Sequence, residues 1–119
     1  MPYIRRVMQT VIETESFLRA ARDAKMNADE IAQAVDLVAA GPEVGVLMQG
    51  TGGVRKVRLA GRGKGKSGGY RIVYFYGGGD IPVFLLTVFG KGEKDNLSQG
   101  ERNALRSVTG TLKKSLGAR

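Results

Sequence analysis

Three segments in the second half of the chain alternate their side chains with a period of two: residues 54–60, 70–76 and 83–89. Successive side chains of a strand point to opposite faces, so this period predicts three strands. Residues 77–80 (Gly-Gly-Gly-Asp) separate the last two segments as a hairpin loop, and residues 61–69 separate the first two as a longer, basic loop. Strands joined in this way pair antiparallel, so the pattern predicts a small antiparallel sheet.

Helical signals flank these strands. Capping-box motifs occur at residues 27–30 (Asn-Ala-Asp-Glu) and 98–101 (Ser-Gln-Gly-Glu), each followed by apolar residues at helical spacing. The elements expected outside the three strands are a first strand over residues 3–12, for which a helix is the alternative, a short helix from Thr14, a longer helix that ends at Gly41 and a C-terminal helix. Together they predict an α+β fold with helices clustered on one face of the sheet.

The length and composition exclude several classes of protein. A chain of 119 residues fits one domain, which we place over residues 1–119. The sequence has no Cys and no His, which removes Ser-His-Asp and Cys-His nucleophiles and most zinc sites, so we expect neither a metal nor a cofactor. We see no apolar run long enough to span a membrane and no signal-peptide pattern, and we therefore expect a cytoplasmic protein.

Charge is distributed unevenly along the chain. The formal net charge is +8, and residues 50–119 hold fourteen basic and four acidic side chains. Residues 1–49 hold five basic and seven acidic side chains, and no acid occurs between Val44 and Gly79. Such an uneven, basic distribution of charge favours a polyanionic partner, most often nucleic acid. The alternative is a basic protein without such a partner.

Seven cations fall within seventeen residues: Arg55, Lys56, Arg58, Arg62, Lys64, Lys66 and Arg71. Two of them, Lys56 and Arg58, are two residues apart on a predicted strand and therefore share one face, whereas Val57 and Leu59 take the other face and enter the core. Two cations on an open sheet face suit a phosphodiester. A solvated strand face is the alternative, but such faces normally mix Lys with acids or Thr.

The basic loop does not match a nucleotide-binding P-loop, because the glycine that the motif requires falls on Ala60 and a strand follows instead of a helix. We interpret the loop as a basic finger whose Arg62, Lys64 and Lys66 approach a phosphate backbone. Tyr70, beside this loop, is either a core residue or a platform for a base.

Arg71 and two cations further along the chain have two interpretations each. Arg71 is either a cation that faces a cleft or the structural partner of a carboxylate such as Glu93 or Asp95. Lys91 and Lys94 lie near the end of the last predicted strand, where they either join the cation cluster or are ordinarily solvated.

Several segments resemble the HigB branch of the RelE/HigB toxins of bacterial type II toxin–antitoxin modules. The resemblance is carried by residues 49–58 (Gln-Gly-Thr-Gly-Gly-Val-Arg-Lys-Val-Arg), 63–74 (Gly-Lys-Gly-Lys-Ser-Gly-Gly-Tyr-Arg-Ile-Val-Tyr), 85–91 (Leu-Leu-Thr-Val-Phe-Gly-Lys) and 95–98 (Asp-Asn-Leu-Ser). It implies a RelE-like sheet of about four strands packed against N-terminal helices. It also implies an endoribonuclease that cuts mRNA in the ribosomal A site, and a helix-turn-helix antitoxin that forms a hetero-oligomer with the toxin.

The resemblance assigns catalytic positions to Lys56, Arg58, Arg71 and Lys91. Lys94 fits the last of these positions loosely. From their charge and their place beside these residues, we expect RNA contacts from Arg55, Arg62, Lys64, Lys66, Tyr70 and Lys94. A second basic position of the family falls on Gly92, and a C-terminal Tyr of the family has no counterpart here, Ser98 being nearest. The general acid and base are therefore not assigned.

RNA chemistry is compatible with a site made of cations, because the 2′-hydroxyl of the RNA is itself the nucleophile. Such an enzyme needs only to hold that oxygen in line and to stabilise charge on the phosphorane. Two other functions stay open at this point. One is ParE-like inhibition of DNA gyrase without catalysis, and the other is a basic nucleic-acid-binding module.

Overall fold

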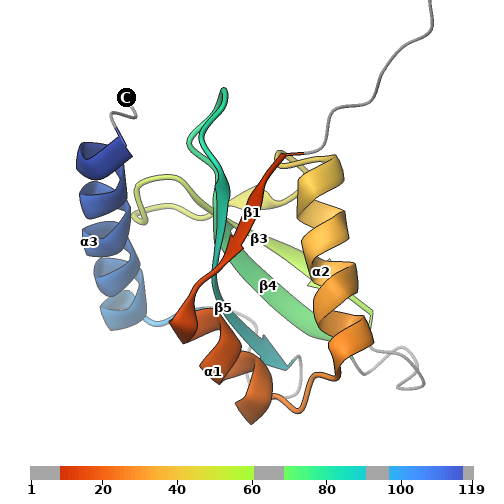
Figure 1. Ribbon diagram of the computed structural model, residues 1–119. Helices are drawn as coiled ribbons and strands as arrows, with labels where there is room; N and C mark the ends of the chain where they lie inside the picture. Colours follow the sequence, from red (N-terminus) through yellow and green to blue (C-terminus); the bar gives the residue numbers. More distant parts are fainter. Residues whose placement is uncertain (1–8, 61–68, 91–96, 117–119) are drawn as a thin grey trace, which may run out of the picture.

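The computed structural model describes residues 9–60, 69–90 and 97–116. Its centre is a five-stranded sheet with the order β1-β5-β4-β3-β2 (Figure 1). The strands are β1 (Val11–Glu13), β2 (Val46–Leu47), β3 (Val54–Leu59), β4 (Tyr70–Phe75) and β5 (Val83–Gly90). The helices are α1 (Glu15–Asp23), α2 (Ala28–Ala40) and α3 (Gln99–Leu116).

The three predicted strands are confirmed as β3, β4 and β5, which form an antiparallel meander. The first strand is shorter than predicted: β1 begins at Val11, and residues 3–8 lie outside the described residues. It pairs parallel to β5, with Val11 opposite Val83. The long connection between β1 and β5 permits this direction, because all other strands lie between them in the sequence and no hairpin joins them.

The expected number of about four strands is corrected to five by β2, which sequence patterning did not reveal. This strand has two residues, and both are exposed, so it carries no alternation to detect. It pairs antiparallel with β3, with Val46 opposite Lys56. The hydroxyl of Tyr74 fixes the residue before it by accepting a hydrogen bond of 2.8 Å from the amide of Gly45. Tertiary contacts, and not an alternating sequence pattern, therefore specify this strand.

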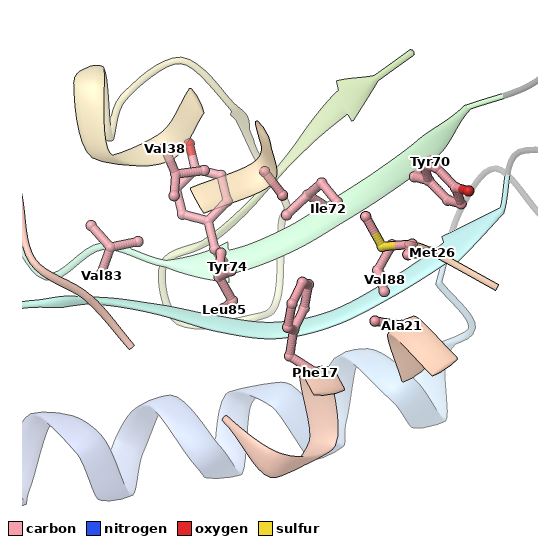
Figure 2. Close-up of a cluster of buried hydrophobic side chains, with 11 residues drawn as sticks. Phe17, Ala21, Met26, Val38, Tyr70, Ile72, Tyr74, Val83, Leu85 and Val88 are labelled. Atoms are coloured by element: carbon pink, nitrogen blue, oxygen red, sulfur yellow. The ribbon is translucent and has the colours of Figure 1, made fainter. Parts of the chain in front are cut away.

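Helices α1 and α2 cover one face of the sheet. Both begin at caps visible in the sequence. The side chain of Thr14 accepts from the amide of Phe17, and Asn27 and Glu30 form the predicted capping box. Their apolar sides meet the sheet in a core that is drawn in Figure 2 and includes Phe17 of α1, Val38 of α2, and Tyr74 and Leu85 of the sheet. This face of the molecule is closed.

Helix α3 packs on the opposite face, so the prediction that all helices share one face is wrong. Leu105 and Leu112 contact a second core cluster that contains Val54, Phe75 and Leu97. The reason lies in β4 and β5, whose side chains are buried on both faces and therefore need cover on both. Hydrogen bonds also hold α3, among them that of the Thr109 hydroxyl to the carbonyl of Thr51, at 2.9 Å.

A β-bulge in β5 changes which side chains face α3. Val73 pairs with Thr87 whereas Tyr74 pairs with Leu85, so Leu86 is the extra residue. Leu86 packs in the cluster on the α3 side, and the two strand positions on either side of the bulge, Leu85 and Val88, pack on the α1 and α2 side. The bulge thus places Leu86 and Thr87 together on the α3 face.

Candidate functional site

Two cations on β3 share the α3 face of the sheet. Lys56 lies directly opposite Val73, which packs in the α3-side cluster, and Arg58 lies two residues further on. Val57 and Leu59 pack against the other core, as their alternation predicts. Arg58 is exposed, and Lys56 is half-buried. The sequence therefore assigned the faces of β3 correctly.

Arg71 on β4 joins these cations through the register of the sheet. It lies directly opposite Arg58 in the antiparallel pair. Side chains at opposite positions have their Cβ atoms about 5 Å apart, and two like charges there repel each other. An anion bound between two guanidinium groups relieves this repulsion and receives hydrogen bonds from both. We call Lys56, Arg58 and Arg71 the cationic cluster.

Of the three cations in the cluster, Arg71 is the one whose side chain is held by its surroundings. Arg71 is half-buried, and its Nη1 atom is shielded from solvent. On its other side Arg71 lies opposite Phe89 of β5, a side chain that is 5% exposed. Arg71 thus lies between Arg58 and an aromatic residue on the same face. Its stem is held in place, whereas Arg58 projects into solvent.

Arg55 lies away from the cluster. It is on the opposite face of β3, and its Nη1 donates hydrogen bonds to the carbonyl oxygens of Gly45, at 2.7 Å, and Glu43, at 3.2 Å. The guanidinium therefore fastens the segment before β2 to the sheet. The sequence grouped Arg55 with the other cations because they are neighbours in the chain, but the strand sends neighbours to opposite faces.

Tyr70 also lies outside the cluster, on the α1 and α2 side. It is 3% exposed, and its hydroxyl donates a hydrogen bond of 3.1 Å to Oε1 of Glu30. Burial, and then the hydrogen bond to the Glu30 carboxylate, raise the pKa of the Tyr70 hydroxyl. Of its two interpretations from sequence, the structure supports the core residue.

The other predicted site residues lie outside the described residues. These are Arg62, Lys64 and Lys66 in the loop between β3 and β4, and Lys91 and Lys94 after β5. Glu93 and Asp95, considered above as carboxylate partners of Arg71, lie there too.

Two residues near the site were not found from sequence. Phe89 and Thr87 face α3 on β5, and both looked like ordinary strand residues. Phe89 lies opposite Arg71, and Thr87 lies in one row with Val73 and Lys56. This arrangement follows only from the pairing register, which depends on the bulge. The hydroxyl of Ser98, the residue nearest to the missing Tyr of the resemblance, accepts a hydrogen bond of 3.1 Å from the amide of Glu101. It caps α3.

A model of the family described as the RelE toxin of the RelE/RelB toxin–antitoxin system matches residues 9–118. This chain belongs to the RelE toxin family. Among solved structures, that of an Arg-to-Ala double mutant of the E. coli toxin RelE in the free state is similar, with 22% sequence identity and a TM-score of 0.47. That match covers 69% of this chain and 82% of the other.

Membership of the RelE family confirms the coarser expectation from sequence, a toxin of a toxin–antitoxin system, and brings with it a cognate antitoxin as partner. Within the described segments, no helix has the length and apolarity to cross a membrane. The described residues also contain no cluster of three or more metal-ligating side chains.

Proposed function

We propose that this RelE family toxin is a ribosome-dependent mRNA endonuclease of the HigB branch, which inhibits translation by cleaving mRNA. The observation that carries this proposal is the pairing of Arg58 with Arg71, with Lys56 on the same face. A phosphodiester is the anion that such a face suits, because it presents two oxygens to two guanidinium groups.

The reaction needs no nucleophile from the protein. The 2′-oxygen of the RNA attacks the adjacent phosphorus while the bond from phosphorus to the 5′-oxygen breaks, which leaves a 2′,3′-cyclic phosphate and a 5′-hydroxyl. One proton leaves the 2′-hydroxyl, and one is delivered to the departing 5′-oxygen. The transition state carries additional negative charge on the non-bridging oxygens, where preorganised cations stabilise it most.

Each cation of the cluster has a role in this scheme. Arg71, held in position on β4, donates two parallel hydrogen bonds to the phosphorane. Arg58 reaches the same group from the facing strand, and Lys56 adds positive charge along β3. Lys91 is proposed as a fourth catalytic residue, and Arg62, Lys64, Lys66 and Lys94 as contacts to the RNA backbone, from charge and sequence position. Arg55 and Tyr70 are left out because their polar groups are used within the fold.

We infer ribosome dependence from the kinds of side chain that β3 and β4 do not carry. β3 and β4 carry cations, apolar side chains and Tyr, but neither of these described strands carries an acid or a His. Transition-state charge is therefore well stabilised, whereas proton transfer and in-line positioning have little support. A ribosome that holds the mRNA in one conformation supplies the positioning. We therefore expect free RNA to be cut poorly.

The cognate antitoxin is proposed to be a helix-turn-helix protein that forms a hetero-oligomer with the toxin. A chain of net charge +8 with an exposed cationic face requires neutralisation in the cell, and an acidic segment of a partner provides it. We expect the toxin to co-purify with the product of the adjacent gene and to arrest growth when expressed alone.

The experiment is to map transcript 5′ ends after induction of the toxin without its antitoxin. The purified chain is then incubated with the same message, free or on programmed ribosomes. We expect new 5′ ends inside translated regions, and cleavage on ribosomes that exceeds cleavage of free RNA by a large factor. Growth arrest without new ends, together with inhibited DNA supercoiling, would establish the gyrase alternative. Absence of growth arrest would leave a nucleic-acid-binding module.

A further inference from the structure

A pocket of about 240 Å³ opens on the α3 face of the sheet, between the first turns of α1 and α3. Its floor is apolar and includes Leu86, Leu97 and Leu105, of which the first two are buried. Ala104 lines it from α3 and is exposed. The volume is below the range of pockets that hold drug-sized ligands, so it suits one small group.

This pocket lies on the same face of the sheet as the cationic cluster. Thr87, which lines it, lies opposite Val73, and Val73 lies opposite Lys56. Lys56, Val73 and Thr87 thus form one row across three neighbouring strands. With strands about 4.8 Å apart, the pocket begins about 10 Å from Lys56 on the same face. A neighbouring nucleotide of an RNA strand bound at the cluster reaches that distance.

The polar residues at the pocket suit a base better than a phosphate. Glu101 lines the pocket, and its carboxylate is held in place because Oε1 accepts a hydrogen bond of 2.8 Å from the amide of Ser98. A carboxylate repels a phosphate but accepts hydrogen bonds from an amino group. Thr87 adds a hydroxyl that donates and accepts. Proteins that extrude a base hold it between aromatic or apolar side chains and recognise its edge through hydrogen bonds.

We propose that the pocket between α1 and α3 binds one unstacked RNA base next to the phosphate at the cationic cluster, and prefers bases with an exocyclic amino group. Adenine, cytosine and guanine carry this group, and uracil lacks it. The inference deepens the proposed function and depends on it for the identity of the polymer. Glu101 and Thr87 are its specificity-determining residues.

The test measures binding of the full-length toxin to short labelled oligodeoxyribonucleotides, which lack the 2′-hydroxyl at every position and therefore cannot be cleaved. One position at a time carries adenine, cytosine, guanine, uracil or no base. At one position we expect the three amino-bearing bases to bind about tenfold tighter than uracil or an abasic site, the range of a single hydrogen bond to a charged group.

Variants assign this preference to the pocket. Ala104→Phe fills the pocket and removes the preference. Glu101→Gln keeps the cap, since Gln also serves in a capping box, but weakens the preference for amino groups. Thr87→Val is nearly isosteric and weakens it as well. Thr111→Phe is the matched control, because it adds the same ring at an exposed position two turns further along α3 and leaves the preference intact.

The outcomes separate this inference from the proposed function. Wild-type toxin without any base preference, or an Ala104→Phe variant that melts normally and keeps the preference, overturns the pocket. A toxin that shows the preference, and loses it in the variants, but does not cut mRNA on ribosomes supports the pocket and overturns the nuclease.

Discussion

The two faces of the sheet differ in how they treat polar groups. On the α1 and α2 side, Tyr70 donates to Glu30, and the hydroxyl of Tyr74 both accepts from Gly45 and donates to the carbonyl of Pro42, at 2.8 Å. On the α3 side, the helix covers the part that contains Val54 and Phe75. The part beyond carries the cationic cluster, whose Arg58 is exposed.

Strand β4 contributes to both faces, to the core on one side and to the cationic cluster on the other. Tyr70 and Arg71 are neighbours in β4, yet one is a satisfied core residue and the other lies opposite Arg58. Because successive residues point to opposite faces, the closed face stabilises the strands that present the open one. Substitutions on the closed face should therefore affect stability, and substitutions on the open face should affect cleavage.

The largest effect is expected from Phe17→Ala on the closed face. Phe17 is fully buried, and its removal leaves a cavity between α1 and the sheet. Such truncations cost about 3–5 kcal/mol of folding free energy. Chemical denaturation should show this loss with little change in the rate of cleavage per folded molecule on programmed ribosomes. A Phe17→Ala variant as stable as the wild type would contradict the closed core.

Arg71 gives the next largest effect, on the open face. Arg71→Ala should raise the barrier to cleavage by about 2–4 kcal/mol, the usual cost of losing a preorganised charge stabiliser. Arg71→Lys keeps the charge but not the two parallel hydrogen bonds, so it should lose most activity too. Cleavage rates on programmed ribosomes and thermal melts measure both quantities. Full activity in Arg71→Lys, or a melting temperature that collapses together with activity in both variants, would give Arg71 a structural role instead.

The matched pair Arg58→Gln and Arg55→Gln compares the two faces on a single strand. Arg58→Gln should slow cleavage by about ten- to a hundredfold, as expected when a charged hydrogen bond is lost, and leave stability nearly unchanged. Arg55→Gln should leave cleavage unchanged but lower stability by about 1 kcal/mol, because its bonds to Glu43 and Gly45 are lost. Equal effects of both substitutions on cleavage would show that the cations act through overall charge.

The smallest effect is a pH dependence on the closed face. Burial raises the pKa of Tyr74 and of Tyr70 above the ordinary value of 10.0. The folded state therefore holds these protons more tightly than the unfolded state, so the stabilisation is present below pH 10 and is lost as the pH rises above it. Denaturation midpoints between pH 8 and 11 should fall less steeply in Tyr74→Phe than in the wild type. Identical pH profiles would argue against this contribution.

Much of the fold was predictable from local patterns. Period-two alternation predicted β3, β4 and β5, and both capping boxes marked helix starts. The face of Lys56 and Arg58 followed from alternation as well. In contrast, β2 has two exposed residues and no pattern, and the position of α3 depends on which sheet face is uncovered.

The sequence by itself determined the chemical character of this toxin: a basic polypeptide without Cys or His, with two cations on one strand face. Alternation and capping are local, so neighbouring residues suffice to specify them. Only the tertiary structure decided that Arg58 and Arg71 lie directly opposite each other, that Arg55 and Tyr70 are engaged within the fold, and that a bulge turns Thr87 toward α3. Register and bulges are set by how two strands pack together, and no single segment of the sequence contains that information.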